Sequence, residues 1–142
     1  MASDTSIETD RSAVTQVVLD YFEGWFEGDA ERMARALHPD LAKRSLGGDR
    51  RWWGQNEEGP GDDEPLDNTT ADWMIDATAK GVGKTRLSGD PQIEVEVEDI
   101  YDTIASVTVR SAVYREYLHL VRTRNGWKIA NALWQRTLDS PS

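Results

Sequence analysis

Histidine and tyrosine are the residue types in this chain best suited to acid–base chemistry near neutral pH. The chain has two histidines, His38 and His119, and no cysteine. An imidazole titrates near neutral pH, and a tyrosine hydroxyl in a pocket can donate a hydrogen bond to a ligand oxygen. We therefore take His38 and Tyr21 as candidate catalytic groups and His119 as a candidate pocket residue.

Each of these residues also has a structural interpretation that stays open. His38 stands at the end of a short expected helix, before Pro39, where a cation would stabilise the helix dipole. His119 lies in the middle of an expected strand. It is either a base in the pocket or a buried residue at a dimer face. Tyr21 falls on an apolar helix face, where a tyrosine is more often a core residue whose hydroxyl has a hydrogen-bond partner.

Six tryptophans are many for a chain of 142 residues. Trp25 and Trp73 lie in expected helices with apolar periodicity, where each side chain either packs in the core or contacts a ligand. Trp52 and Trp53 have no periodic context, and they form either a lid over an apolar ligand or a plug in the core. The expected binding residues are Trp25, Trp52, Trp53, Trp73, His119 and Asn131.

The composition excludes several classes of function. Without cysteine the chain has no disulfides, thiolate nucleophile or thiolate zinc site, and two histidines exclude a histidine-rich metal site. We therefore expect no metal and no cofactor. The formal net charge of −10, from 26 acidic against 16 basic residues, repels phosphate backbones and anionic lipid. Nucleic acid and membrane are accordingly not expected as partners.

The length and the chain ends predict one cytoplasmic domain over residues 1–142. The first ten residues lack the basic and apolar regions of a secretory signal, and no run approaches the roughly 18 apolar residues of a membrane span. Residues 1–9 and 138–142 are expected to be flexible ends.

Apolar periodicity predicts helices in the first part of the chain. A first helix is expected over residues 10–27, with an apolar arc wide enough to pack on two sides, and Gly28 ends it. Asp29 caps a second helix over residues 30–37, and residues 41–46 are suited to a short strand. A third helix opens at Thr69, with Asp72 as a capping-box partner.

A long irregular segment covers residues 47–68, where five glycines and two prolines break regular structure. It begins with basic residues and tryptophans and ends acidic. Loops of this length in compact domains are usually lids, binding loops or disordered segments.

Strands follow the helices. Alternating apolar residues predict strands over residues 93–98, 105–113, 114–122 and 127–136, and Asn125-Gly126 predicts a tight hairpin. Helices followed by antiparallel strands indicate an α+β fold. In the expected hairpin register Arg124 pairs with Trp127, and both sheet faces are largely apolar. A homodimer through the sheet would cover the second face.

Several local phrases resemble the nuclear-transport-factor-2-like superfamily, in particular its lumazine-binding and polyketide-cyclase-like branch. They are Tyr21-Phe22-Glu23-Gly24-Trp25, Leu37-His38-Pro39-Asp40, Asp99-Ile100-Tyr101 and Tyr117-Leu118-His119-Leu120-Val121 with Gly126-Trp127-Lys128-Ile129. The resemblance implies a cone of curved antiparallel sheet closed by three helices, with an apolar pocket and usually a dimer. Isomerase-like members carry a catalytic aspartate in the first strand, where this chain has Lys43-Arg44-Ser45-Leu46.

Three hypotheses of function follow. The first is a binding protein for a small hydrophobic molecule in an aromatic-lined pocket. The second is a cofactor-independent isomerase, dehydratase, cyclase or hydrolase that uses the same pocket, with His38 and Tyr21 as its catalytic groups. The third is a dimeric interaction module without a working pocket.

Overall fold

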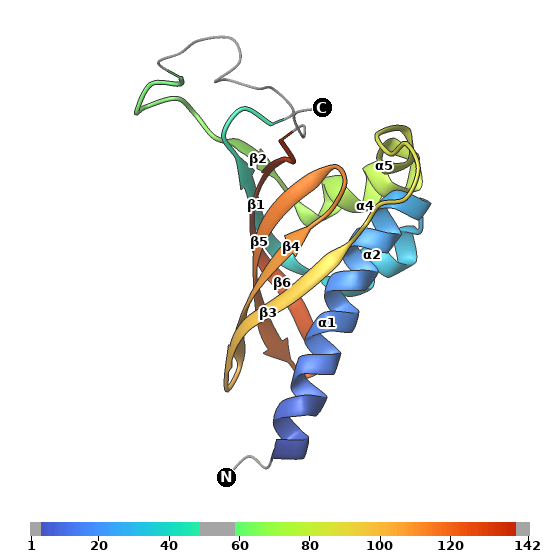
Figure 1. Cartoon of the computed structure of the whole chain (residues 1–142), viewed down its shortest axis with the longest axis vertical. Helices are drawn as coiled ribbons and strands as arrows, with labels where there is room; N and C mark the ends of the chain where they lie inside the picture. The colour runs from blue at the N-terminus through green and yellow to red at the C-terminus, as the bar shows by residue number, and fades with distance from the viewer. Residues whose placement is uncertain (1–3, 49–58, 139–142) are drawn as a thin grey trace.

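The computed structural model describes residues 4–48 and 59–138, so Trp52 and Trp53 lie outside the described part. Figure 1 shows the helices on one side of a curved sheet. The helices are α1 (Asp4–Glu27), α2 (Ala30–Ala36), α4 (Ala71–Ala79) and α5 (Val82–Thr85). The strands are β1 (Leu37–Ser45), β2 (Asp67–Thr69), β3 (Glu94–Tyr101), β4 (Ile104–Arg110), β5 (Tyr114–Thr123) and β6 (Gly126–Arg136).

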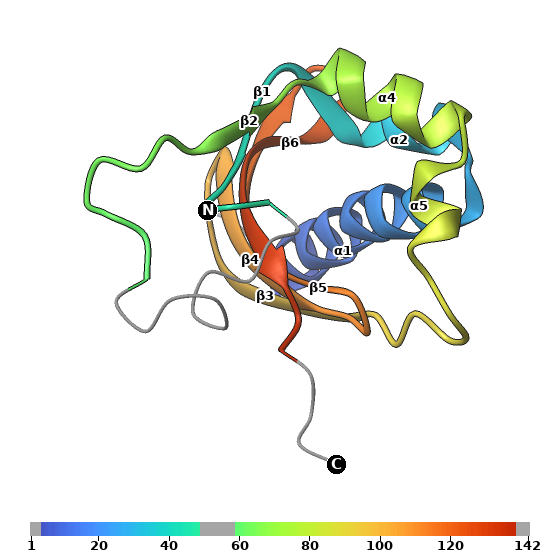
Figure 2. The ribbon, with the colours of Figure 1, turned by 90° about the horizontal axis from the view of Figure 1, so that it is seen from above.

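Helix α1 is the element around which the sheet curves (Figure 2). Its apolar arc is buried, with Val14, Val18 and Phe22 at most 1% exposed. The helix contacts α2 and α5 as well as β3 and β6, so the expected packing against both helix and sheet is confirmed. It begins at Asp4, earlier than expected, and ends before Gly28, whose φ of +75° favours glycine.

Helix α2 begins as expected, because the Asp29 side chain accepts a hydrogen bond from the Arg32 backbone N at 3.1 Å. It ends at Ala36, and Leu37 is already extended. The placement of His38 at a helix end is therefore wrong, since His38 belongs to strand β1. The physical reason is Pro39, which disfavours the α conformation of the residue before it.

Helix α4 begins later than expected. Thr70, not Thr69, is the capping residue, and its Oγ1 accepts a hydrogen bond from the Trp73 backbone N at 3.1 Å. Thr69 belongs instead to β2, which pairs with β1. Helix α5 follows and lies very close to α1, because a Cβ added at Gly83 would stand 2.2 Å from the Trp25 carbonyl oxygen. Only glycine permits this approach.

The six strands form one sheet with the order β2-β1-β6-β5-β4-β3. Neighbouring strands are antiparallel except β1 and β6, which run parallel. The predicted α+β cone, with helices packed on a curved sheet, is confirmed. Its concave face is apolar, with Val107, Leu118, Leu120 and Ile129 at most 1% exposed. No helix within the described ranges is both long and apolar enough to cross a membrane.

The hairpin between β5 and β6 differs from its expected register. Thr123 pairs with Gly126, so the turn residues are Arg124 and Asn125 and not Asn125 and Gly126. A second irregularity follows, because Leu120 pairs with Ile129 but His119 pairs with Asn131. Ala130 is therefore an extra residue, a β-bulge, and beyond it the side chains of β6 change faces.

A buried carboxylate joins α1 to α2. Asp20 is 5% exposed and accepts hydrogen bonds from Arg32 at 2.9 Å and Arg35 at 3.3 Å. Burial by itself would raise the pKa of Asp20, but hydrogen bonds from Arg35, Arg32 and Gln16 outweigh it and hold that pKa below its usual range. Arg32 also reaches Glu23 at 2.6 Å, which completes a network between the helices.

We expect Asp20→Asn to lower the free energy of unfolding by about 2 kcal/mol above about pH 5, because the ionic hydrogen bonds are lost. Since the folded pKa of Asp20 is depressed, its contribution is present above the unfolded pKa and disappears as the pH falls through the folded pKa. Urea unfolding at several pH values measures this difference. Asp76→Asn is the control, because Asp76 forms an exposed pair with Lys80 and its loss should change stability by less than about 0.5 kcal/mol. A stability difference between the wild type and Asp20→Asn that grows toward acid pH would contradict the depressed pKa of Asp20.

Candidate functional site

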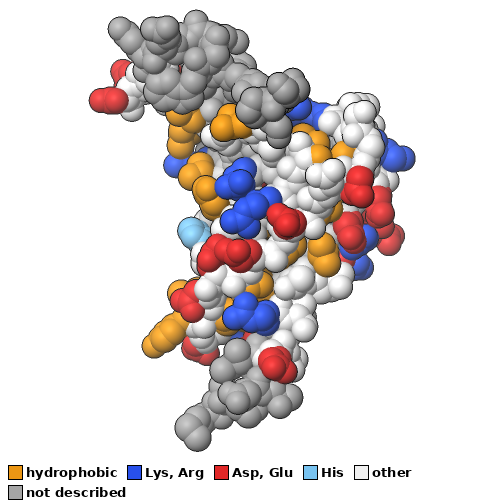
Figure 3. Space-filling model, in the orientation of Figure 1, with side chains coloured by type: hydrophobic (Ala, Val, Ile, Leu, Met, Phe, Trp, Pro, Cys, Tyr) orange, Lys and Arg blue, Asp and Glu red, His pale blue; other side chains and the backbone are white. Residues whose placement is uncertain are grey.

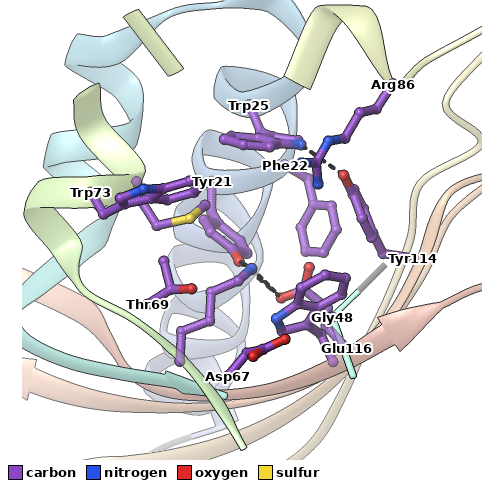
Figure 4. Close-up of a pocket in the computed structure, with 13 residues that line it drawn as sticks. Tyr21, Phe22, Trp25, Gly48, Asp67, Thr69, Trp73, Arg86, Tyr114 and Glu116 are labelled. Atoms are coloured by element: carbon purple, nitrogen blue, oxygen red, sulfur yellow. Dashed lines mark hydrogen bonds and ion pairs between the residues drawn. The ribbon is translucent and has the colours of Figure 1, made fainter. Parts of the chain in front are cut away.

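A cavity of about 210 Å³ lies between α1, α4 and the concave face of the sheet (Figure 4). Six of its thirteen lining residues are aromatic, and their side chains come from two helices and two strands. They are Tyr21, Phe22, Trp25, Trp73, Tyr114 and Trp134. The polar side chains that reach it are Lys43, Asp67, Thr69, Arg86 and Glu116. An aromatic enclosure with few polar groups is typical of sites for small molecules.

The aromatic wall is held in place by its own contacts. Trp25 Nε1 donates a hydrogen bond to the Tyr114 hydroxyl at 3.2 Å, and Figure 4 shows the two side chains pointing toward one another. The Tyr114 ring also meets Trp134 edge to face, with centroids 5.5 Å apart. Because Tyr114 and Trp134 lie on neighbouring strands and Trp25 on α1, these contacts fix the helix against the sheet beside the cavity.

Three polar side chains of the wall form one buried cluster, Lys43, Tyr21 and Glu116, which we call the charged triad. The Tyr21 hydroxyl donates to Glu116 Oε1 at 2.9 Å, and Lys43 Nζ lies 3.3 Å from the same oxygen. Lys43 Nζ also donates to the Tyr21 hydroxyl. The side chains of Lys43 and Glu116 are only 8% and 3% exposed. The triad is thus a buried ion pair bridged by a phenol.

Burial raises the pKa of the Tyr21 hydroxyl well above its ordinary value, and the negative charge of Glu116 raises it further. Tyr21 therefore keeps its proton at any physiological pH and acts as a hydrogen-bond donor. The Lys43 ammonium in turn lies 5.0 Å from the Tyr21 ring centroid and 5.3 Å from that of Trp134. These cation–π contacts help to compensate the lost hydration of Lys43.

This arrangement offers a ligand polar contacts of opposite kind within one small apolar space. Lys43 supplies a cation and donor and Glu116 an acceptor or base, while the Tyr21 hydroxyl, which donates its proton to Glu116, links the two. Charges at such a site act more strongly than in water, because the surrounding dielectric is low. The triad is therefore able to orient a polar ligand edge or to move a proton. Among the described residues, no group of three or more His, Cys, Asp and Glu side chains is placed to hold a metal ion.

Trp52 and Trp53 lie outside the described residues, and the other expected site residues divide into three groups. Tyr21, Trp25 and Trp73 line the cavity. His38 does not line it; its Nδ1 accepts a hydrogen bond from the Asp40 backbone N in β1. His119 and Asn131 face each other on the outer side of the sheet, 3.3 Å apart, where they border a shallow hollow. The Ala130 bulge explains the outward position of Asn131, because alternation without the bulge would turn this residue toward the cavity.

Sequence reasoning did not select Lys43 and Glu116. Each is a charged residue on the buried face of its strand. The residues two positions before and after it are buried, Leu41 and Ser45 for Lys43, and Tyr114 and Leu118 for Glu116. A charge at a core-facing position of a strand is itself a signal, because such burial requires a partner. That the two residues are each other's partner follows only from the tertiary structure.

We expect Lys43→Met and Glu116→Gln each to lower the free energy of unfolding by about 3 kcal/mol, because each leaves a buried partner uncompensated. The double variant should lose clearly less than the sum of the two single losses, since neither orphaned charge remains. Urea unfolding of the four proteins measures this coupling. Strict additivity would show that the two side chains do not interact.

Solved structures share this fold at low sequence identity. An NTF2-like protein of unknown function from Shewanella baltica is 13% identical with a TM-score of 0.66, and the match covers 98% of this chain and 100% of that one. A second, from Silicibacter pomeroyi, is 12% identical with a TM-score of 0.64, covering 92% and 98%. A ketosteroid isomerase-like protein from Erwinia carotovora atroseptica is 14% identical with a TM-score of 0.60, covering 90% and 96%. These matches show the fold alone.

No curated protein matches this sequence. The neighbours described above nevertheless share the fold that the resemblance to the nuclear-transport-factor-2-like superfamily implied. The family model that matches covers residues 9–135, from the second turn of α1 to the last residue but one of β6. This chain therefore belongs to the family described as "Putative lumazine-binding".

Proposed function

We propose that this chain binds a small, flat, largely apolar aromatic molecule in the cavity beneath α1. The observation that carries the proposal is the aromatic enclosure with one charged triad in its wall. Flat rings stack favourably on aromatic side chains, and a few fixed polar groups then select the orientation of the ligand. The family name supports the same class of ligand, because a lumazine is a flat bicyclic heteroaromatic.

The size of the cavity limits the ligand. Its volume of about 210 Å³ is smaller than the roughly 300–1,000 Å³ of sites for drug-sized molecules. One ring or two fused rings would fill it, and a bulky polycyclic ligand would not. The carbonyl oxygens and ring N–H groups of a lumazine complement Lys43, Tyr21 and Glu116, since these offer both donors and an acceptor.

A cofactor-independent enzyme on the same cavity is the second candidate. The buried triad favours it, because a carboxylate, a phenol and an amine within hydrogen-bond distance are suited to proton transfer. A solved neighbour described as ketosteroid isomerase-like points the same way. In such an enzyme Glu116 would be the acid–base group that we had expected His38 to be, and Tyr21 would remain a catalytic group. An interaction module without a working pocket is less favoured, because no described side chain fills the cavity.

Lumazine is the first ligand to test, within a panel of one-ring and two-ring aromatics. We expect at least one member to bind with a micromolar Kd by calorimetry, and Glu116→Gln to weaken that binding by about tenfold or more. Glu94→Gln, an exposed glutamate of edge strand β3, is the matched control and should leave the Kd unchanged. Failure of the whole panel to bind, or equal binding by Glu116→Gln, would contradict the proposal.

The outer face of the sheet supports a homodimer, as the sequence led us to expect. Tyr117 pairs with Leu133 there, and the two are 49% and 52% exposed, with Ile104 at 55%. Figure 3 shows hydrophobic side chains emerging among charged ones along the side of the molecule that the sheet forms. A second copy would cover these apolar groups by presenting the same strands, as a two-fold interface requires.

Leu133→Glu should convert the dimer into a monomer, because it places a charge at the centre of the proposed interface. Light scattering after gel filtration at micromolar concentration measures the mass, and circular dichroism checks the fold. Leu66→Glu, at an exposed leucine before β2, is the matched control and should remain dimeric. A monomeric mass for the wild-type chain would contradict the proposed dimer.

A further inference from the structure

Lys43 is an unusual residue for the wall of an apolar cavity. It lies in β1 at a core-facing position, and its side chain is 8% exposed. The amine reaches the cavity between the rings of Tyr21 and Trp134. A lysine held in such a place loses hydration that an exposed lysine keeps, and desolvation is one of the ways by which proteins make an amine nucleophilic.

We propose that Lys43 is a nucleophile that captures the carbonyl carbon of an aromatic aldehyde or ketone as an imine. The inference rests on the proposed function, because the carbonyl compound must first enter the cavity. It deepens that function by naming the reactive group and the ligand class. A noncovalent ligand needs only the shape and the hydrogen bonds of the cavity, whereas an imine also needs a base and a proton donor beside the amine.

The two neighbours of Lys43 supply these roles. Glu116 Oε1 lies 3.3 Å from Lys43 Nζ, so the carboxylate can accept a proton from the ammonium and free its lone pair. In a medium of low dielectric, the resulting neutral amine and neutral acid are less disfavoured than they are in water. The Tyr21 hydroxyl lies between the two, bonded to both, and can pass a proton from nitrogen to oxygen.

The atoms and charges balance without any further reactant. The neutral amine attacks the carbonyl carbon, a C–N bond forms, and the C=O π pair moves to oxygen. The nitrogen then loses a second proton, which reaches this oxygen through Tyr21 and gives a neutral carbinolamine. Glu116 returns the first proton to the same oxygen, the C–O bond breaks, and water leaves. The nitrogen lone pair forms the C=N bond, so an ammonium and a carbonyl become an iminium and water, with Glu116 again a carboxylate.

The other lysines of the chain lack this setting and serve as internal references. The Lys80 side chain is 69% exposed and pairs with Asp76, and Lys84 is also exposed. Lys128 Nζ donates to the Arg35 carbonyl oxygen at 2.6 Å. Ammonium groups in contact with water remain strongly hydrated. A carbonyl probe should therefore distinguish Lys43 from Lys80, Lys84 and Lys128 within a single sample.

The experiment treats the full chain with benzaldehyde and sodium cyanoborohydride at neutral pH, which fixes any imine as a stable benzylamine. Peptide mass spectrometry then gives the rate of modification at each lysine. We expect Lys43 to react about tenfold faster than Lys80 or more. Glu116→Gln should lower the rate of modification at Lys43 by about tenfold and leave the rate at Lys80 unchanged. Glu94→Gln, the matched control on β3, should change neither rate, and Lys43→Arg should abolish the fast adduct.

The outcomes separate this inference from the proposed function. Calorimetry with benzaldehyde alone, without reductant, reports whether the cavity binds a small aromatic. Binding in the cavity with labelling at Lys43 no faster than at Lys80 would overturn the imine and leave the binding proposal standing. Neither binding nor fast labelling would overturn both. Because the comparison of lysines is made within the wild-type chain, it holds even if the Lys43 and Glu116 variants fail to fold.

Discussion

The packing of α1 into the concave side of the sheet is the constraint on which the rest of the structure depends. A strongly curved sheet leaves a hollow that one apolar helix can fill, and Val18 and Phe22 do so against strand residues such as Leu118. Close to Trp25 the helix also meets α5, which approaches it through Gly83. The cavity is the space that remains between α1, α4 and the concave face of the sheet.

The charged triad lies where stability alone would favour apolar side chains. Burying an ammonium and a carboxylate removes both from water, and their mutual attraction offsets that loss only when the geometry is good. Here the pair is joined by Tyr21 and the ammonium faces two aromatic rings, so each buried charge has close partners. Such a cluster fixes the relative positions of α1, β1 and β5, and it also concentrates acid–base groups in one wall of the cavity. The same contacts therefore serve folding and the proposed chemistry.

The two faces of the sheet have different roles, and a single extra residue in β6 separates them. Before Ala130 the strand turns Trp127 and Ile129 inward; beyond it Trp134 turns inward and Leu133 outward. The bulge thus adds an aromatic side chain to the cavity and leaves an apolar one on the outer face. Ligand site and proposed dimer face are coupled through the backbone of this one strand, since a change of its register would exchange their residues.

The sequence by itself determined the α+β class, the apolar arc of α1 and the presence of Tyr21, Trp25 and Trp73 at the site, because these depend on periodicity along one element. The tertiary structure decided the rest. The sequence left open which face of the sheet holds His119, and Asn131, expected at the cavity, faces outward beside it because the turn is shifted by one residue and β6 contains a bulge. Lys43 and Glu116 are far apart in the chain, and only the order of strands around β6 brings them together. Periodicity gives the face of a side chain, but its partner depends on long-range register, which local sequence does not encode.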